Sequence, residues 1–180
     1  MVTTLLEWII MPIQNDELTV ARHNKQLHRN FQGYCTRRTT GQVYAFGVTG
    51  ISQLSGVYAQ NTKSIDQYIA NINQGELTTI KGYALNDQQI IVREVINELM
   101  CNEQIVWGDI GERLGFSSVE IKNNTTYNPE LLQQFENDGI ITLSEEKIQI
   151  TPEGQLFIRT VAASLDPLTQ AGQTNFSKPV

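Results

Sequence analysis

The chain has 180 residues, of which 40% are hydrophobic and 18% are charged, and its formal net charge is −6 at pH 7. This length accommodates one ordinary domain or two small ones, and the hydrophobic content suffices to build a core. Proteins that coat nucleic acid or anionic membranes depend on clustered Lys and Arg, which an acidic chain lacks overall. We therefore expect neither nucleic acid nor a membrane among its partners.

The charge is unevenly distributed along the chain. Residues 1–63 carry six Lys or Arg against three Asp or Glu, a balance of +3. Residues 64–180 carry seven against sixteen, a balance of −9. The basic part contains residues 27–52, the stretch whose composition best suits a ligand-binding surface.

Cysteines and histidines are too few to assemble a metal cluster. The chain holds two of each, Cys35, Cys101, His23 and His28. No familiar spacing makes an iron–sulfur cluster or a structural zinc site from these alone. The N-terminus has neither the basic region nor the cleavage site of a secretory signal. We expect a cytoplasmic chain with reduced thiols, in which both cysteines are packing residues.

The N-terminal segment is apolar. In residues 4–13, TLLEWIIMPI, β-branched and aromatic residues precede Pro12, which favours an extended segment or a short helix ending at Met11. The run is too short to span a bilayer. If the chain is a fragment, this segment would have packed on the missing part of the longer protein. We then expect the segment to be disordered or to make a non-native contact such as dimerisation.

The first half of the chain predicts a small antiparallel sheet with flanking helices. Asn15 or Asp16 caps a helix that we expect to run to about Leu27. The expected elements that follow are a turn at Gly41, a strand over residues 43–52, a second strand over 54–60, a helix over 64–73 capped by Ser64, and an extended segment over 77–85. The helix places Ile65, Tyr68, Ile69 and Ile72 on one face, which we expect to pack in a core.

The second half predicts a mostly helical module. Asn86 or Asp87 begins a long helix whose apolar stripe is Ile90, Ile91, Val95, Ile96, Leu99 and Met100. Helices over 106–114 and 129–138, a hairpin over 141–150 and a closing helix over 152–165 follow. This is the order of a winged-helix unit. The fold class is therefore α+β, with a domain over 1–85 and a winged-helix-like domain over 86–180.

The winged-helix-like module has the wrong charge for a DNA reader. In such readers, the recognition helix carries basic and amide side chains into the major groove. Here the corresponding helix, residues 129–138, contains Glu130, Glu136 and Asp138 and no Lys or Arg. Repulsion from phosphate would oppose docking. The module is therefore expected to be a packing or lid domain.

Residues 27–52 combine basic, aromatic and small side chains. The basic residues are His28, Arg29, Arg37 and Arg38, and the aromatic and amide residues are Phe31, Gln32 and Tyr34. Arg can hold carboxylates through charge-assisted hydrogen bonds, and aromatic rings offer faces to flat ligands. A solvated basic strand would have the same composition. On composition alone, both interpretations stay open.

Four sequence blocks resemble one enzyme family. LHRNFQGY (27–34), GVTGIS (47–52), YAQN (58–61) and LMCN (99–102) occur in the order found in the C-terminal portion of oxygen-independent coproporphyrinogen III oxidase. The likeness extends from about Asp16 to the terminal FSKPV. The family's N-terminal barrel, with its Cys-x3-Cys-x2-Cys motif, is absent from this chain.

The resemblance implies a radical reaction in the parent enzyme. In that family, a [4Fe-4S] cluster cleaves S-adenosylmethionine to a radical that abstracts hydrogen from two propionates of coproporphyrinogen III. Each propionate then loses carbon dioxide to leave a vinyl group, which gives protoporphyrinogen IX. A second S-adenosylmethionine lies beside the first, and Phe31, Gln32 and Ile51 match the residues that line its site.

The substrate's four propionates require cationic partners. The candidates in this chain are Arg29, Arg37 and Arg38, although Arg29 could equally satisfy carbonyl groups near a helix end. The resemblance thus implies coproporphyrinogen III and S-adenosylmethionine as the parent's ligands. Without the cluster cysteines, we expect this chain to be inert alone and to retain neither cofactor stably.

Two other functions remain open at this point. The first is a non-enzymatic haem- or tetrapyrrole-binding module, which relatives of the family suggest, with His23 or His28 as an axial ligand. The second is an acidic winged-helix adaptor that binds protein partners. Whether the parent is an oxidase or a haem-binding relative is not decided by the sequence.

Overall fold

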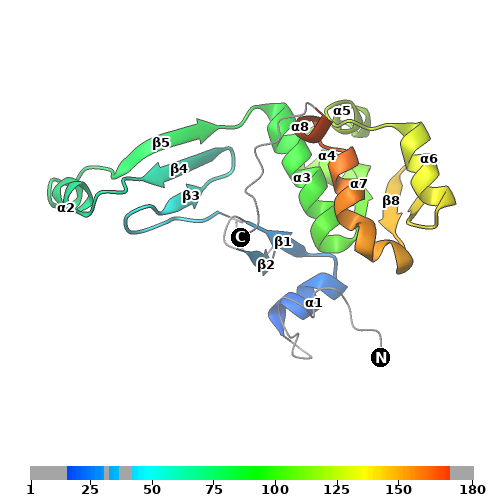
Figure 1. The fold of residues 1–180 in the computed structure, drawn as a ribbon, viewed down its shortest axis with the longest axis horizontal. Helices are drawn as coiled ribbons and strands as arrows, with labels where there is room; N and C mark the ends of the chain where they lie inside the picture. Colours follow the sequence, from blue (N-terminus) through cyan, green and yellow to red (C-terminus); the bar gives the residue numbers. More distant parts are fainter. Residues whose placement is uncertain (1–15, 31–32, 37–41, 171–180) are drawn as a thin grey trace. The chain divides into compact units, whose positions relative to one another are not determined.

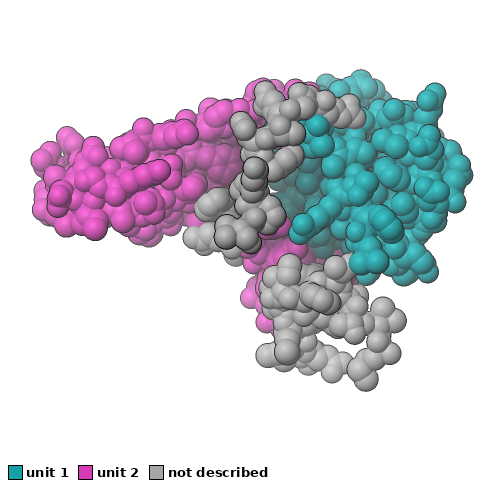
Figure 2. All heavy atoms as spheres, viewed as in Figure 1, with its two compact units in different colours: residues 1–14, 91–180 teal, residues 15–90 magenta. Residues whose placement is uncertain are grey.

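The computed structural model describes residues 16–30, 33–36 and 42–170 (Figure 1). The chain divides between Ile90 and Ile91 into two compact units (Figure 2). The expectations for residues 4–13, for the turn at Gly41 and for a dimer through the N-terminal segment lie outside the described residues. Small antiparallel sheets and helices alternate, which confirms the α+β class.

The unit over 15–90 holds two small sheets. Its elements are α1 (Glu17–His23), β1 (Leu27–Arg29), β2 (Tyr34–Thr36), β3 (Ile51–Gln53), β4 (Val57–Asn61), α2 (Ile65–Asn73) and β5 (Thr79–Ala84). β1 pairs with β2, and the second sheet has the order β3-β4-β5, with every pairing antiparallel. The expected small antiparallel sheet is therefore present.

Helix α1 begins as predicted but ends early. The Asp16 carboxylate accepts a hydrogen bond from the backbone N–H of Leu18 at 3.0 Å, which makes Asp16 the N-cap. The helix ends at His23 rather than near Leu27. Lys25 takes a left-handed conformation (φ 55°), and the chain reverses so that Leu27, only 2% exposed, opens β1. Burial of Leu27 in the strand replaces its expected place on the helix.

The strand predicted over residues 43–52 is mostly absent. Val43 forms an isolated bridge to Gln53, and regular pairing starts only at Ile51. Between these points Gly47 (φ 92°) and Thr49 (φ 62°) adopt left-handed conformations. An extended run cannot pass through such residues, so the segment folds into a loop. Alternating side chains did not reveal this break.

Helix α2 is correctly placed, but its packing was predicted wrongly. Ser64 caps it, accepting a hydrogen bond from the N–H of Gln67 at 3.3 Å. Ile65, Ile69 and Ile72 are 64%, 52% and 54% exposed, and no residue of the helix is buried. The helix lies at one end of the β3-β4-β5 sheet (Figure 1), and the three isoleucines of its apolar stripe are exposed there. Helical spacing identified the stripe but not what packs on it.

The unit over 91–170 is a helical module around a third sheet. After α3 (Asp87–Asn102) come β6 (Gln104–Val106), α4 (Trp107–Leu114), α5 (Ser118–Asn123), α6 (Pro129–Asn137), β7 (Ile141–Leu143), β8 (Lys147–Ile150), the 3-10 helix η2 (Glu153–Phe157), α7 (Ile158–Ser164) and α8 (Pro167–Gln170). The antiparallel sheet has the order β6-β8-β7. This order is compatible with a winged helix, and the winged-helix assignment itself stays a prediction.

A continuous core holds this unit together. Its buried members are Ile91, Val95, Leu99, Ile105, Trp107, Ile110, Ile121, Leu132, Ile141, Ile148, Ile150, Val161, Ala162 and Leu165. The predicted stripe of α3 supplies the first three, and Ile96 and Met100 pack against the cluster. Trp107 meets Tyr127 edge-to-face, with ring centroids 5.7 Å apart. The amphipathic periodicity of α3 is therefore confirmed by burial.

Two helical features of this unit were missed or merged. The six-residue helix α5 was not predicted, although Ser117 and Glu120 form a capping box whose S-x-x-E signature is visible in the sequence. Hydrogen bonds from Ser117 lower the pKa of Glu120. The closing helix expected over 152–165 divides into η2 and α7. At Gly154 the backbone lies so close to the Ile140 carbonyl that a Cβ would overlap it.

One buried carboxylate ties α3 to α4. Glu98, 6% exposed, accepts hydrogen bonds from Asn102 Nδ2 at 2.7 Å and from Arg113 Nη2 at 2.8 Å. A buried charge needs such partners because desolvation is costly. The network thus fixes one helix against the next by polar contacts beside the apolar core.

Truncation of the core should cost far more stability than truncation of the exposed stripe. We expect Leu99→Ala to lower the free energy of unfolding by about 2–5 kcal/mol, because Leu99 is fully buried. Ile69→Ala should change it by less than about 0.5 kcal/mol. Urea unfolding followed by circular dichroism measures both. Equal losses for the two variants would show that something covers α2.

Removal of Arg113 should expose the cost of the buried carboxylate. Arg113→Ala is expected to destabilise the chain by about 1–3 kcal/mol, because Glu98 loses a charged partner. The control is Arg159→Ala, which removes an exposed guanidinium from α7. The midpoints of thermal unfolding of the two variants are compared. An unchanged midpoint for Arg113→Ala would contradict the stabilising role given to the Glu98–Arg113 ion pair.

Candidate functional site

Of the six site residues predicted from the sequence, the structure describes two. Arg29 lies in β1 and Ile51 begins β3. The other four, Phe31, Gln32, Arg37 and Arg38, lie outside the described residues. Their grouping with Arg29 and Ile51 therefore stays a prediction.

The β1–β2 hairpin sets the environment of Arg29. Arg29 pairs in register with Tyr34, and its guanidinium carbon lies 5.6 Å from the centre of the Tyr34 ring. A guanidinium that rests on an aromatic face presents its N–H donors at its edge, in the geometry that carboxylates accept. Arg29 is exposed. The arrangement is chemically suited to an anionic ligand.

Ile51 is partly buried and stands next to a well-anchored loop. It pairs with Gln60 across β3 and β4. The loop before it is hydrogen-bonded to other elements, for example from the Gly47 N–H to the Tyr68 hydroxyl at 2.8 Å. An apolar side chain at this point can supply a nonpolar contact to a ligand.

The donor set does not fit an iron–sulfur cluster. The chain has only two cysteines, whereas such a cluster needs three or four thiolates. Cys101 is buried in α3, where its thiol donates to Asn97 Oδ1 at 3.1 Å, and Cys35 belongs to β2. Among residues 16–30, 33–36 and 42–170, no group of three or more His, Cys, Asp or Glu could hold a metal ion.

The histidines proposed as haem ligands occupy different elements. His23 is exposed at the end of α1, with Nδ1 2.9 Å from the Thr19 carbonyl oxygen. His28 is half-buried in β1, opposite Cys35. Nothing in this placement gathers the two around a common ligand.

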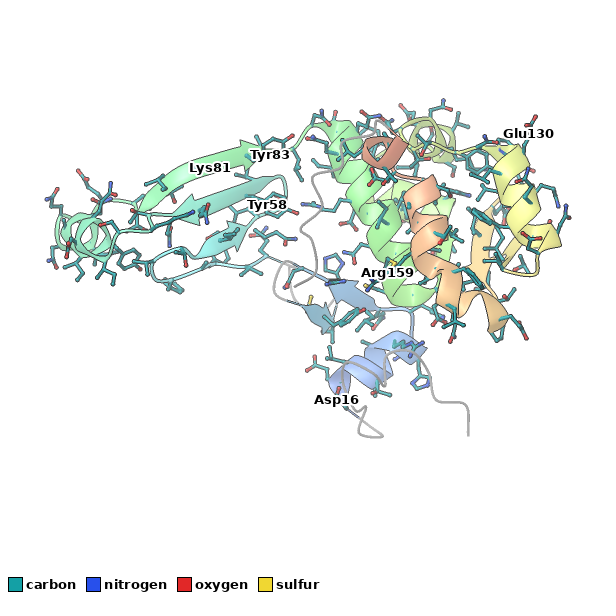
Figure 3. The ribbon with its side chains drawn as sticks, viewed as in Figure 1. Asp16, Tyr58, Lys81, Tyr83, Glu130 and Arg159 are labelled. Atoms are coloured by element: carbon teal, nitrogen blue, oxygen red, sulfur yellow. The ribbon has the colours of Figure 1, made fainter. Side chains whose placement is uncertain are left out.

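The unit over 15–90 exposes an unusual share of its apolar side chains. Its exposed large hydrophobic residues are Val20, Tyr44, Phe46, Val57, Ile65, Ile69, Ile72, Leu77, Ile80 and Tyr83, whereas its buried ones are Ala21, Leu27 and Val43. Figure 3 shows Tyr83 on β5 and Tyr58 on the neighbouring β4, where the two residues pair. Apolar surface of this extent is typical of an interface.

No helix in the described part of the chain combines the length and apolar character needed to cross a membrane.

Comparisons with known proteins agree with one another. Residues 85–157 match the HemN C-terminal domain. The oxygen-independent coproporphyrinogen III oxidase of Synechocystis sp. is 34% identical over 172 residues, which are 92% of this chain and 36% of that protein. The enzyme of the same name from Escherichia coli is 33% identical, over 84% of this chain and 32% of the relative.

A solved structure extends the likeness to the fold. Coproporphyrinogen III oxidase (HemN) from Escherichia coli, described as a radical SAM enzyme, matches with a TM-score of 0.70 and 34% identity. The match covers 86% of this chain and 35% of that one. The chain thus spans about a third of the length of these relatives.

The module that begins near residue 85 is thus similar to HemN C-terminal domains. Over most of its length, the chain is homologous to the C-terminal portion of oxygen-independent coproporphyrinogen III oxidase. The resemblance stated from four short sequence blocks is confirmed.

Proposed function

We propose that this chain supplies the C-terminal part of an oxygen-independent coproporphyrinogen III oxidase of haem biosynthesis. In the proposed reaction, two propionates of coproporphyrinogen III undergo oxidative decarboxylation to vinyl groups, giving protoporphyrinogen IX in the cytoplasm. The observation that carries the proposal is a match in sequence and fold over most of the chain, to relatives that bear this name.

In this proposal, the chain contributes one wall of the reaction site. Gln32 donates and accepts hydrogen bonds to a second S-adenosylmethionine, while Phe31 and Ile51 supply apolar contacts. Arg29, Arg37 and Arg38 pair with propionate carboxylates. The stacking of Arg29 on Tyr34 supports its part, because it orients the guanidinium edge.

The exposed apolar surface also supports this role. Residues 1–85 are proposed as an edge of the catalytic domain, with 86–180 as a winged-helix-like packing or lid domain. The unit over 15–90 buries few large hydrophobic residues and exposes many. Such a surface is expected where a larger enzyme, about three times the length of this chain, continues the fold.

Generation of the radical is assigned to the part of the parent enzyme that this chain lacks. The chemistry that the cluster supplies is reductive cleavage of S-adenosylmethionine, and two cysteines on separate elements do not fit that cluster. The residues of this chain are therefore proposed to bind and orient ligands and to exclude water.

The chain alone should assemble no cluster. After anaerobic reconstitution with iron and sulfide, we expect the 180-residue chain to show no stoichiometric cluster absorbance, because its thiols are too few. The full-length Escherichia coli relative, treated identically, is the positive control. A cluster band on this chain, with about four iron atoms per polypeptide by iron analysis, would overturn this assignment.

Arg29 should matter for substrate affinity in the enzyme that contains this chain. Loss of one charge-assisted hydrogen bond costs about 1.5–3 kcal/mol, so we expect Arg29→Ala to weaken coproporphyrinogen III binding about tenfold or more. Arg159→Ala is the charge-matched control. Binding is measured by fluorescence titration alongside thermal unfolding. Unaltered affinity in Arg29→Ala would remove Arg29 from the site.

The proposed function itself is tested in the source organism. Deletion of the region that encodes this chain should cause coproporphyrin III to accumulate during growth without oxygen, since its decarboxylation stops. Extracted porphyrins are identified by fluorescence after chromatography. Unchanged porphyrin levels, in a strain with no second enzyme for this step, would contradict the function.

A further inference from the structure

The loop over residues 44–50 is closed on itself at its base. Val43 and Gln53 exchange two backbone hydrogen bonds, of 2.8 and 2.9 Å. One step inward, the N–H of Ala45 donates to the Ser52 hydroxyl at 3.0 Å. Ile51 therefore follows directly from a loop whose two ends are held together.

The tip of this loop has a conformation that needs external support. Thr49 adopts φ 62° and Gly47 adopts φ 92°. The left-handed region is common for glycine but rare for a β-branched residue such as Thr, and it persists only where surrounding contacts hold it. The Thr49 N–H donates to the Thr62 carbonyl at 2.9 Å, which is one such contact.

Asn61 provides the central support. It is 7% exposed at the end of β4. Its Nδ2 donates to the carbonyl oxygens of Ala45 at 3.3 Å and Gly47 at 3.0 Å. Its backbone N–H donates to the Gly50 carbonyl at 2.9 Å. One buried residue thus holds three points of the loop.

The chemistry of an amide suits this position. A carboxamide nitrogen has two hydrogens, and two carbonyl groups accept them here. A carboxylate would oppose lone pairs to both carbonyls, and an apolar side chain would leave both without this donor. Tyr68 adds a second anchor from α2, because its hydroxyl accepts the Gly47 N–H.

Asn61 is also linked to the residue proposed to contact the cofactor. Ile51 pairs with Gln60, the residue directly before Asn61, and Asn61 binds Gly50, the residue directly before Ile51. We propose that Asn61 is a positioning residue, which fixes the loop over 44–50 and thereby the place of Ile51 in the wall of the second S-adenosylmethionine site. The inference rests on the proposed function for the role of Ile51.

The test compares two replacements of the same side chain. Asn61→Asp keeps the shape and replaces the donors by a carboxylate, and Asn61→Ala removes the group. Gln60→Glu is the control, since it makes the same amide-to-acid change one residue away. Amide hydrogen exchange of Gly47 and Thr49 and the methyl resonance of Ile51 are measured by NMR on the full chain, without ligand.

At neutral pH, both Asn61 variants should lower the protection factors of Gly47 and Thr49 by at least about tenfold, since two hydrogen bonds are lost. Both should also shift the Ile51 methyl resonance more than Gln60→Glu does. Acidification should restore protection in Asn61→Asp alone, because a protonated carboxyl donates one hydrogen bond. If the substitution simply destabilised the unit, amide protection would not recover on acidification.

Wild-type protection in both variants, or loss in Asn61→Asp that persists in acid while the β7–β8 amides stay protected, would overturn the proposal. If an Asn61 variant unfolds the unit, Tyr68→Phe replaces it. Tyr68→Phe removes only the hydroxyl group that accepts the Gly47 N–H. The Gly47 amide should therefore lose protection, and the Ile51 methyl resonance should shift. No change in either measurement would count against the proposal. These NMR measurements need no cofactor. They can therefore contradict the role of Asn61 without contradicting the proposed function, which the reconstitution and porphyrin experiments test.

Discussion

Burial of the apolar stripe of α3 is the interaction on which the described structure depends most. Ile91, Val95 and Leu99 are all fully buried, and they join β6, β8 and the later helices in one core. Burying such side chains stabilises by about 1.5–3 kcal/mol each. The unit over 15–90 has no comparable core among its described residues, and its order depends instead on strand pairing and side-chain hydrogen bonds.

This contrast explains which parts of the fold the sequence could predict. In α3 the expected helix and its buried face are both present, and α6 begins at Pro129 after the expected cap Asn128. In α2 the cap and the periodicity also located the helix, but the expected burial of its apolar stripe was wrong, because spacing says nothing about what packs on a face. The strand over 43–52 failed for a different reason, since positive φ at Thr49 has no signal in side-chain alternation.

The candidate site was predictable only as far as its motifs reached. Blocks such as LHRNFQGY and GVTGIS identified a family, and homology over 92% of the chain agrees with them. The block YAQN contributed to this identification, but the sequence assigned no role to its Asn61, because hydrogen bonds between a strand and a loop cannot be predicted from composition. An amide directly after the predicted strand over 54–60, three residues before the helix cap Ser64, was the available signal.

The sparse core of the unit over 15–90 gives its polar contacts more weight than they would have elsewhere. In a close-packed domain, a loop is confined from several sides by neighbouring atoms, so the loss of one hydrogen bond moves it little. Here the loop over 44–50 carries exposed Tyr44 and Phe46, and its strained tip is held by hydrogen bonds to Asn61, Thr62 and Tyr68. Directional bonds then confine this loop, and in our proposal Asn61, the residue that makes three of them, positions Ile51 without touching a ligand.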